Sequence, residues 1–184
     1  MIRTLGIDPG SQKTGWAVID HQGQRLIWVA SGVIRLGSGP FPERMATLGL
    51  ALREIVVSHQ PTQMAIEEVF LAKDPQSALK LGHARGVAMF IGAEAQLPVF
   101  EYAARRVKQV VVGQGQADKR QMQTMVKLLL GLSQSLPEDA ADAAGVAICH
   151  AHSSSGLAGT GSTTSQSHRR RSQVGRWRLK DDAS

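Results

Sequence analysis

The sequence has almost no cysteine and no long uninterrupted apolar run. Its one cysteine, Cys149, allows neither an internal disulfide nor a cysteine-based zinc site, which excludes a disulfide-stapled secreted fold and a zinc finger. No apolar run approaches the length that spans a bilayer, and the first residues lack the apolar stretch and cleavage site of a secretory signal. We therefore expect a cytoplasmic protein without membrane spans, whose chemistry uses side chains other than cysteine.

At 184 residues the chain is long enough for one domain with a sizeable core. Hydrophobic residues make up 42% of it and charged residues 20%, so most of the chain is not a disordered polyelectrolyte. After His152 the composition changes to Ser, Thr, Gly and Ala, and an Arg169–Arg171 run follows. We predict a folded domain over residues 1–152 and a flexible, low-complexity basic tail over residues 153–184.

The net charge of +6 is unevenly distributed along the chain. Residues 1–72 are balanced, whereas residues 73–127 contain nine basic and four acidic residues. Residues 128–150 contain three acids and no basic residue. Separate basic and acidic surfaces suggest a site that handles phosphates through metal ions, although charge alone leaves a solvated helix face equally open.

The pattern of apolar residues predicts three antiparallel strands, followed by alternating helices and strands and then by helices. We expect strands at residues 2–7, 14–20, 25–34, 64–67 and 98–102. We expect helices at residues 43–59, 75–96, 104–111, 118–130 and 137–150. Pro9 and Gly10 suit the centre of a type II turn after the first strand. This order predicts an α/β layer fold with a mixed sheet.

Four acidic residues stand where a core should be apolar: Asp8, Glu67, Asp139 and Asp142. Such placements need an explanation, because a buried, ionised carboxylate without a partner is costly. Each of these acids also has an ordinary alternative explanation. Asp8 could be a turn residue and Glu67 could pair with an arginine. Asp139 and Asp142 could be first-turn acids that interact favourably with the helix dipole. Taken together, without a set of histidines or cysteines, they suggest oxygen ligands for Mg²⁺ or Mn²⁺.

Four carboxylates match two divalent ions about 3.5–4 Å apart, a pair that sets up in-line attack of water on a phosphodiester. One ion would activate the nucleophile and the other would stabilise the leaving oxygen. The chain contains no G-x-x-x-x-G-K-[ST] motif, which excludes a P-loop nucleotidase. The implied reaction is phosphodiester hydrolysis.

Several blocks of the sequence closely resemble the RuvC family of bacterial Holliday junction resolvases. In chain order these blocks are Gly6–Ser11 with Thr14-Gly15, Ala65–Phe70, Ser77–Gly86, Val99–Ala103 with Val107–Gln109, and Asp139–Ala143. The match extends from Met1 to about His152. It implies an RNase H-like mixed five-stranded sheet flanked by helices, a homodimer, and metal-dependent nicking of two opposing strands of a four-way DNA junction. It also implies RuvA and RuvB as partner proteins.

The resemblance assigns the family's catalytic acids to the same four positions, Asp8, Glu67, Asp139 and Asp142. They would hold Mg²⁺, with two ions per subunit, and Mn²⁺ could substitute.

The resemblance and the basic middle of the chain also indicate DNA contacts. Lys108 and Lys119 match basic residues near the cleaved backbone, and Phe70 matches an aromatic residue that stacks on a base at the junction centre. We expect further DNA contacts from Lys73, Lys80, Arg85 and Arg105.

Two other functions remain open at this point. One is an RNase H-like nuclease that cuts RNA–DNA hybrids, and the other is a non-catalytic, structure-selective DNA-binding protein. Phe70 and the basic helix at residues 75–96 favour a junction, since cleavage of a hybrid needs no inserted ring. Four acids at core positions argue against a non-catalytic protein, because they would repel the DNA backbone unless metal were present.

Symmetric cleavage of a junction needs two copies of the acidic site, which predicts a two-fold dimer. The expected interface is the helix at residues 75–96, where Gly82 and Gly86 allow two backbones to approach and Leu79, Met89 and Phe90 supply apolar area. The alternative is that this face packs wholly inside the monomer.

Overall fold

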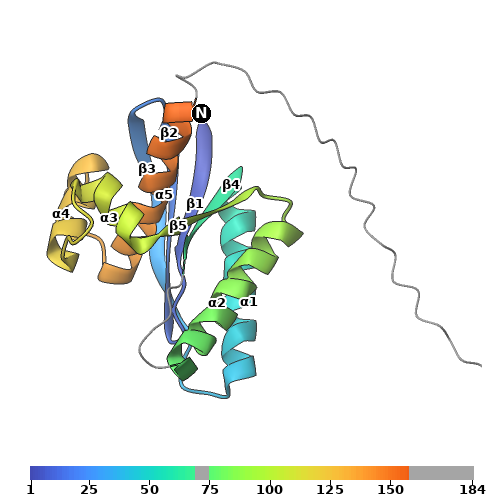
Figure 1. The fold of residues 1–184 in the computed structure, drawn as a ribbon. Helices are drawn as coiled ribbons and strands as arrows, with labels where there is room; N and C mark the ends of the chain where they lie inside the picture. Colours follow the sequence, from blue (N-terminus) through green and yellow to red (C-terminus); the bar gives the residue numbers. More distant parts are fainter. Residues whose placement is uncertain (69–74, 158–184) are drawn as a thin grey trace, which may run out of the picture.

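The computed structural model describes residues 1–68 and 75–157. Its centre is a five-stranded sheet in the order β3-β2-β1-β4-β5 (Figure 1). The strands are β1 (Ile2–Asp8), β2 (Lys13–Gln22), β3 (Arg25–Arg35), β4 (Gln63–Glu68) and β5 (Val99–Ala103). The β1–β2 and β2–β3 pairs are antiparallel, whereas the β1–β4 and β4–β5 pairs are parallel. This mixed sheet confirms the expected fold class.

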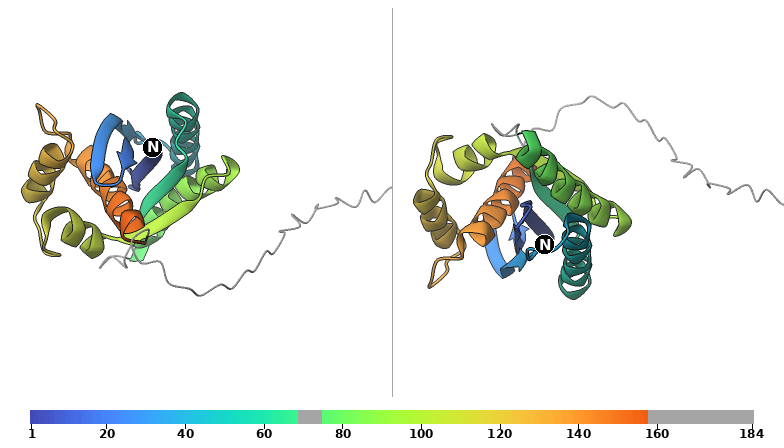
Figure 2. Two further views of the ribbon diagram at one scale, coloured as in Figure 1. Left: turned by 90° about the horizontal axis from the view of Figure 1, so that it is seen from above. Right: turned by 90° about the horizontal axis from the view of Figure 1, so that it is seen from below.

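Within the described residues, five helices cover the two faces of the sheet. They are α1 (Phe41–His59), α2 (Pro75–Glu94), α3 (Ala104–Val112), α4 (Lys119–Leu129) and α5 (Glu138–Leu157). The helices α1 and α2 lie on one face, α5 lies on the other, and α3 and α4 lie beyond α5 (Figure 2). None of these helices is both long and apolar enough to cross a membrane.

The predicted strands and helices are present, but the last helix was predicted to end too early. The expected end was near His150, whereas α5 continues to Leu157. The serines after His152 do not stop the helix, and the Ser154 hydroxyl donates a hydrogen bond to the Ala151 carbonyl within it. The predicted boundary between domain and tail at residues 152–153 therefore falls inside α5, and residues 158–184 lie outside the described part of the chain.

The prediction of a type II turn after β1 was wrong, because Gly10 does not adopt the positive φ that this turn requires. Glycine is needed at this position for a different reason. A Cβ on Gly10 would lie 1.9 Å from the carbonyl oxygen of Lys13. The Thr14 hydroxyl also accepts from the Gly10 N–H at 3.2 Å and donates to the Gly10 carbonyl at 3.1 Å. This compact turn fixes the chain directly after Asp8.

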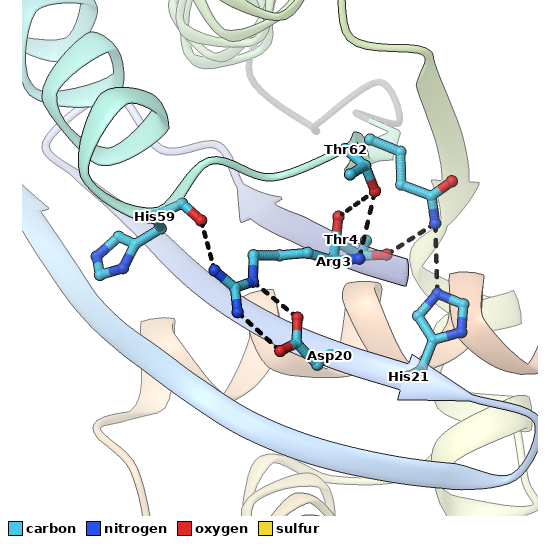
Figure 3. A network of polar contacts seen from close by, with 7 residues as sticks. Arg3, Thr4, Asp20, His21, His59 and Thr62 are labelled. Atoms are coloured by element: carbon cyan, nitrogen blue, oxygen red, sulfur yellow. Dashed lines mark hydrogen bonds and ion pairs between the residues drawn. The ribbon is translucent and has the colours of Figure 1, made fainter. Parts of the chain in front are cut away.

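A polar network secures the opposite end of β1 (Figure 3). The guanidinium of Arg3 donates to both carboxylate oxygens of Asp20, at 2.7 and 2.8 Å, and to the His59 carbonyl at the end of α1. Hydrogen bonds from Arg3 hold the pKa of Asp20 below its ordinary value, so this buried carboxylate stays charged. The Thr62 hydroxyl donates to the Arg3 carbonyl, which joins the start of β4 to the same network.

Helix α5 packs closely on the sheet because small residues line both surfaces. A Cβ on Gly6 would lie 2.2 Å from the Ala143 carbonyl oxygen, and one on Gly15 would lie 1.8 Å from the Asp139 carbonyl oxygen. The helix side of this contact is made of fully buried alanines: Ala140, Ala143, Ala144 and Ala147. Gly15 lies opposite Asp8 in the β1–β2 register, so this contact sets where the first turn of α5 meets the end of β1.

We expect Gly15→Ala to destabilise the protein by about 1–3 kcal/mol, because the new methyl group would displace the first turn of α5. Gly49→Ala is the control, since a Cβ there would make an ordinary 3.7 Å contact with Val87 inside the helical pair. That variant should gain up to about 1 kcal/mol of helix propensity. Thermal unfolding measures both, and equal stability of the two variants would contradict the close packing described above.

Candidate active site

The strands β1 and β4 place two acids side by side. Successive side chains of a strand alternate between faces, so Asp8 points to the α5 face together with Gly6, and Glu67 points there with Ala65. In the parallel register of β1 and β4, Gly6 pairs with Ala65 and Ile7 pairs with Ile66. Asp8 and Glu67 therefore follow at the same level on adjacent strands.

A cavity of about 180 Å³ lies where these strand ends meet α3, α4 and α5. Its acidic lining residues are Asp8, Glu67, Asp118 and Asp142, and its basic ones are Lys108 and Lys119. Ala104, Val107 and Met122 form its apolar wall. The fold thus brings together three of the four predicted acids and both lysines that were expected near a cleaved backbone.

Asp139, the fourth predicted acid, is not one of the residues that line the cavity. It lies in the first turn of α5, with its main-chain carbonyl against Gly15. Its negative charge nevertheless contributes to raising the pKa of Asp8, so the two carboxylates are close enough to repel each other. A ligand role for Asp139 remains a prediction.

Three of the cavity's carboxyl groups, those of Asp8, Glu67 and Asp142, have pKa values above their ordinary ones. Burial, followed by repulsion from Glu67 and Asp142, raises the pKa of Asp8 to about 8. Burial and the charge of Asp142 raise the pKa of Glu67 to about 7, with Lys108 acting in the opposite direction. Burial also raises the pKa of Asp142. At neutral pH, protons or added cations must therefore balance part of the negative charge.

The donor set suits a hard divalent cation, because carboxylate oxygens are the ligands that Mg²⁺ and Mn²⁺ prefer. The crowding that raises the pKa of Asp8 and Glu67 is relieved when a cation replaces their protons. Over residues 1–68 and 75–157, no three acidic, histidine or cysteine side chains lie as close together as the ligands of one bound ion.

The two lysines of the cavity are held differently. Lys108, on α3, is half-buried and lowers the pKa of Glu67 and Asp142. Lys119, the first residue of α4, is exposed and forms an ion pair with Glu138, the first residue of α5. The Glu138 partner raises the pKa of Lys119. Both amines are therefore in place beside the acids.

Among the remaining predicted DNA contacts, those that the structure describes do not line the cavity. Phe70 and Lys73 lie outside the described residues. Lys80 is exposed on α2, and Arg105 is exposed on α3, where its aliphatic part packs on Gly115. Arg85 has an intramolecular partner, since its guanidinium forms an ion pair with Glu101 on β5. That pair joins α2 to the edge of the sheet.

Sequence reasoning did not select Asp118, Met122 or Glu138 as site residues. Asp118 and Gln121 form a capping box, whose three-residue spacing is a recognisable signal for the start of α4. That signal predicts a helix end but no cavity. No sequence pattern points to the Lys119–Glu138 pair, because it joins the starts of two separate helices.

Comparison with known proteins identifies the family. The family model "Crossover junction endodeoxyribonuclease RuvC" matches residues 4–150. The chain is 54% identical to the RuvC of Citrifermentans bemidjiense over 150 residues, which cover 81% of this chain and 92% of that protein. It is 53% identical to the RuvC of Pectobacterium atrosepticum over 148 residues, which cover 80% of this chain and 87% of that protein.

A solved structure agrees with these sequence matches. The T. thermophilus RuvC in complex with a Holliday junction substrate superposes with a TM-score of 0.80 at 30% identity, covering 85% of this chain and 97% of that one. The order of the strands, the acidic cavity and these matches lead to one conclusion. The chain belongs to the RuvC family of crossover junction endodeoxyribonucleases.

Proposed function

We propose that this protein resolves four-way (Holliday) DNA junctions by hydrolysing one phosphodiester bond in each of two opposing strands. The observation that carries this proposal is the cavity where Asp8, Glu67 and Asp142 meet beside Lys108 and Lys119, in a chain that belongs to the RuvC family. A family of DNA endonucleases favours DNA over RNA–DNA hybrids as the substrate. A cavity rich in acids is unfavourable for a protein that only binds DNA, because it repels phosphate.

The RuvC family depends on metal for its nuclease activity. Here Asp8, Glu67 and Asp142 would hold Mg²⁺, with Asp139 at the edge of the same site and Mn²⁺ as a substitute. Two ions per subunit would match four carboxylates. When bound, the metal would supply an activated water and would neutralise charge on the phosphate.

The chain's own residues bind and orient the DNA backbone. Lys108 and Lys119 place their amines beside the acids, where they attract phosphate oxygens into a site that would otherwise repel them. Val107 and Met122 form an apolar wall that limits water and strengthens the electrostatic contacts inside the cavity. Lys80 and Arg105 would add exposed phosphate contacts, and Arg85 could do so only after leaving Glu101.

The second copy that paired cleavage requires would bind along α2. The outer face of this helix carries a groove of about 780 Å³, lined by Pro75, Ala78, Leu79, Gly82, His83, Gly86, Val87 and Phe90. Leu79 and Phe90 are 64% and 58% exposed. Within the described residues, a Cβ on Gly82 or Gly86 would meet nothing within 4 Å, which argues against the alternative that this face packs wholly inside the monomer.

Two features support a second copy as the partner at this groove. A junction presents two equivalent strands, and one chain carries a single set of the four acids. In addition, glycines on an outer helix face let two backbones come close together without internal rearrangement. RuvA and RuvB are further partners that we infer from family membership alone.

Glu67→Gln and Asp142→Asn should each abolish cleavage of a labelled synthetic four-way junction in Mg²⁺. Both substitutions keep the shape of the side chain and remove a ligand charge, so metal organisation should fail before folding does. Binding of the same junction in Ca²⁺, measured by gel shift, should stay close to wild type. Near wild-type cleavage by either variant would show that the substituted residue is not a ligand.

The metal-free protein should lose stability as the pH rises from about 6.5 to about 8.5, and Mg²⁺ should restore it. The folded pKa values of about 8 for Asp8 and about 7 for Glu67 exceed the values of free carboxyl groups. Between the ordinary pKa values of 3.8 and 4.5 and these folded values, the folded state binds more protons than the unfolded state, so stability falls as the pH rises through that range and the fall is complete just above pH 8. Calorimetry at both pH values, with EDTA or Mg²⁺, measures the unfolding temperature that reports this change in stability.

Asp8→Asn is the matched variant for this measurement. It removes the carboxyl group with the larger pKa shift, so the metal-free variant should unfold at a higher temperature than wild type at about pH 8.5 and should gain less from Mg²⁺. A wild-type protein whose stability shows no dependence on Mg²⁺ at either pH would contradict the assignment of this site to a metal.

Gly82→Lys should convert the dimer into a folded monomer that still binds DNA but no longer cuts both strands of a junction in one binding event. A Cβ at this exposed position meets nothing within 4 Å inside the described chain and a lysine side chain can extend into solvent, so loss of the dimer would report on the interface and not on misfolding. Val57→Lys is the control, because it puts the same charge on an exposed apolar position of α1 outside the groove. Light scattering measures the mass of each variant in solution. An unchanged dimer in Gly82→Lys would place the interface elsewhere.

A further inference from the structure

The ion pair between Lys119 and Glu138 lies at an exposed edge of the acidic cavity, which we call the cavity mouth. Lys119 lines the cavity and begins α4, whereas Glu138 begins α5 and does not line it. The two side chains are 69% and 47% exposed, so the pair faces solvent. The pair therefore joins a residue that lines the cavity to an exposed residue outside it.

Lys119 is not placed for the stability of its own helix. A cation at a helix N-terminus is at the unfavourable end of the helix dipole. The start of α4 is already satisfied by the Asp118–Gln121 capping box. Glu138 supplies the strongest interaction that the Lys119 amine makes, and Asp142 and Asp139 add weaker attraction from the cavity side. Its position is thus set by charges at the start of α5.

We propose that Glu138 is a positioning residue for junction cleavage, which holds the Lys119 amine at the cavity mouth until a DNA phosphate takes the place of the Glu138 carboxylate. The inference rests on the proposed function and extends it. An exposed ion pair contributes only about 0–1 kcal/mol, so it can be exchanged readily. A phosphate offers the amine charge-assisted hydrogen bonds at least as strong as those of a carboxylate.

The need for a holding residue follows from the length of the lysine side chain and from the charges around it. A lysine amine on four flexible methylene groups moves toward the nearest excess of negative charge. Without Glu138, that excess is the group of carboxylates within the cavity, where Asp8 and Asp142 already interact with Lys119. An amine drawn inside would compete with metal for the carboxylates and would no longer be at the mouth to meet the phosphate.

A double-mutant cycle tests the proposal with the full chain, a labelled four-way junction and Mg²⁺ under single-turnover conditions. Glu138→Gln should slow cleavage about two- to fivefold, the rate equivalent of an exposed ion pair. Lys119→Gln should slow it on the order of a hundredfold, as loss of one charge-stabilising donor does. In the Lys119→Gln background, Glu138→Gln should have little further effect, because the proposed role of Glu138 acts through the lysine and its direct repulsion of Asp142 is a smaller contribution.

Binding and two further variants separate positioning from a general effect of charge. In Ca²⁺ at low salt, Glu138→Gln should bind the junction as tightly as wild type or more tightly, because one charge that repels phosphate is lost. Glu43→Gln removes the same charge from the first turn of α1, and it should leave the cleavage rate unchanged. Glu138→Asp keeps the charge and should recover part of the rate.

Each unfavourable outcome has a distinct meaning. Wild-type cleavage by Glu138→Gln beside an impaired Lys119→Gln would overturn the positioning role and leave the proposed function intact. An equal loss from Glu138→Gln in both backgrounds would also overturn it, since Glu138 would then act without the lysine. Wild-type cleavage by Lys119→Gln would overturn the inference together with the role proposed for Lys119, whereas the variants of Glu67 and Asp142 would still test the catalytic acids separately.

Discussion

The close contact between α5 and the sheet is the constraint on which the acidic site depends. Gly6 and Gly15 leave no room for a side chain beneath the helix, and alanines face them from α5. Alanine and glycine bury little apolar area, so this layer adds less to stability than large side chains would. On the opposite face of the sheet, large buried residues such as Leu5, Leu48 and Met64 contribute to stability through apolar burial. The α5 face has its own buried cluster, which includes Ile19, Val126 and Ile148, but only this face also brings a helix close enough to build the acidic site.

Proximity creates an electrostatic problem that the surrounding helices reduce. Asp8 and Glu67 lie on adjacent strands, and α5 brings Asp142 to them, so each carboxylate raises the cost of charging the next. The cavity is bordered by the first residues of α3 and α4, and helix N-termini carry partial positive charge. Lys108 and Lys119 come from these same two helices. The helices α3 and α4 therefore supply the charge that makes an acidic site compatible with a phosphate backbone.

The sequence predicted the sheet and three of the cavity acids because their signals are local. Gly6-Ile7-Asp8 and Ala65-Ile66-Glu67 each alternate a small residue, a core residue and an acid, which fixes the face of both carboxylates. The structure added what depends on contacts between distant segments. Gly10 is required by a close carbonyl and not by its φ, and Arg85 has a partner on β5. Neither fact can be derived from spacing along the chain.

Glycine leaves room for a neighbouring backbone both inside the domain and on its surface. The helices α1, α2 and α5 all begin at the end of the sheet where β1 finishes, so the acidic cavity and the start of the α2 groove lie at one end of the domain (Figure 1). Gly6 and Gly15 bring α5 onto the sheet there, and Gly82 and Gly86 leave the outer face of α2 open. In the proposed dimer, a two-fold axis along that face would set the spacing of the two cavities through rigid elements. The separation of the two cuts would then follow from the backbone packing of the described elements.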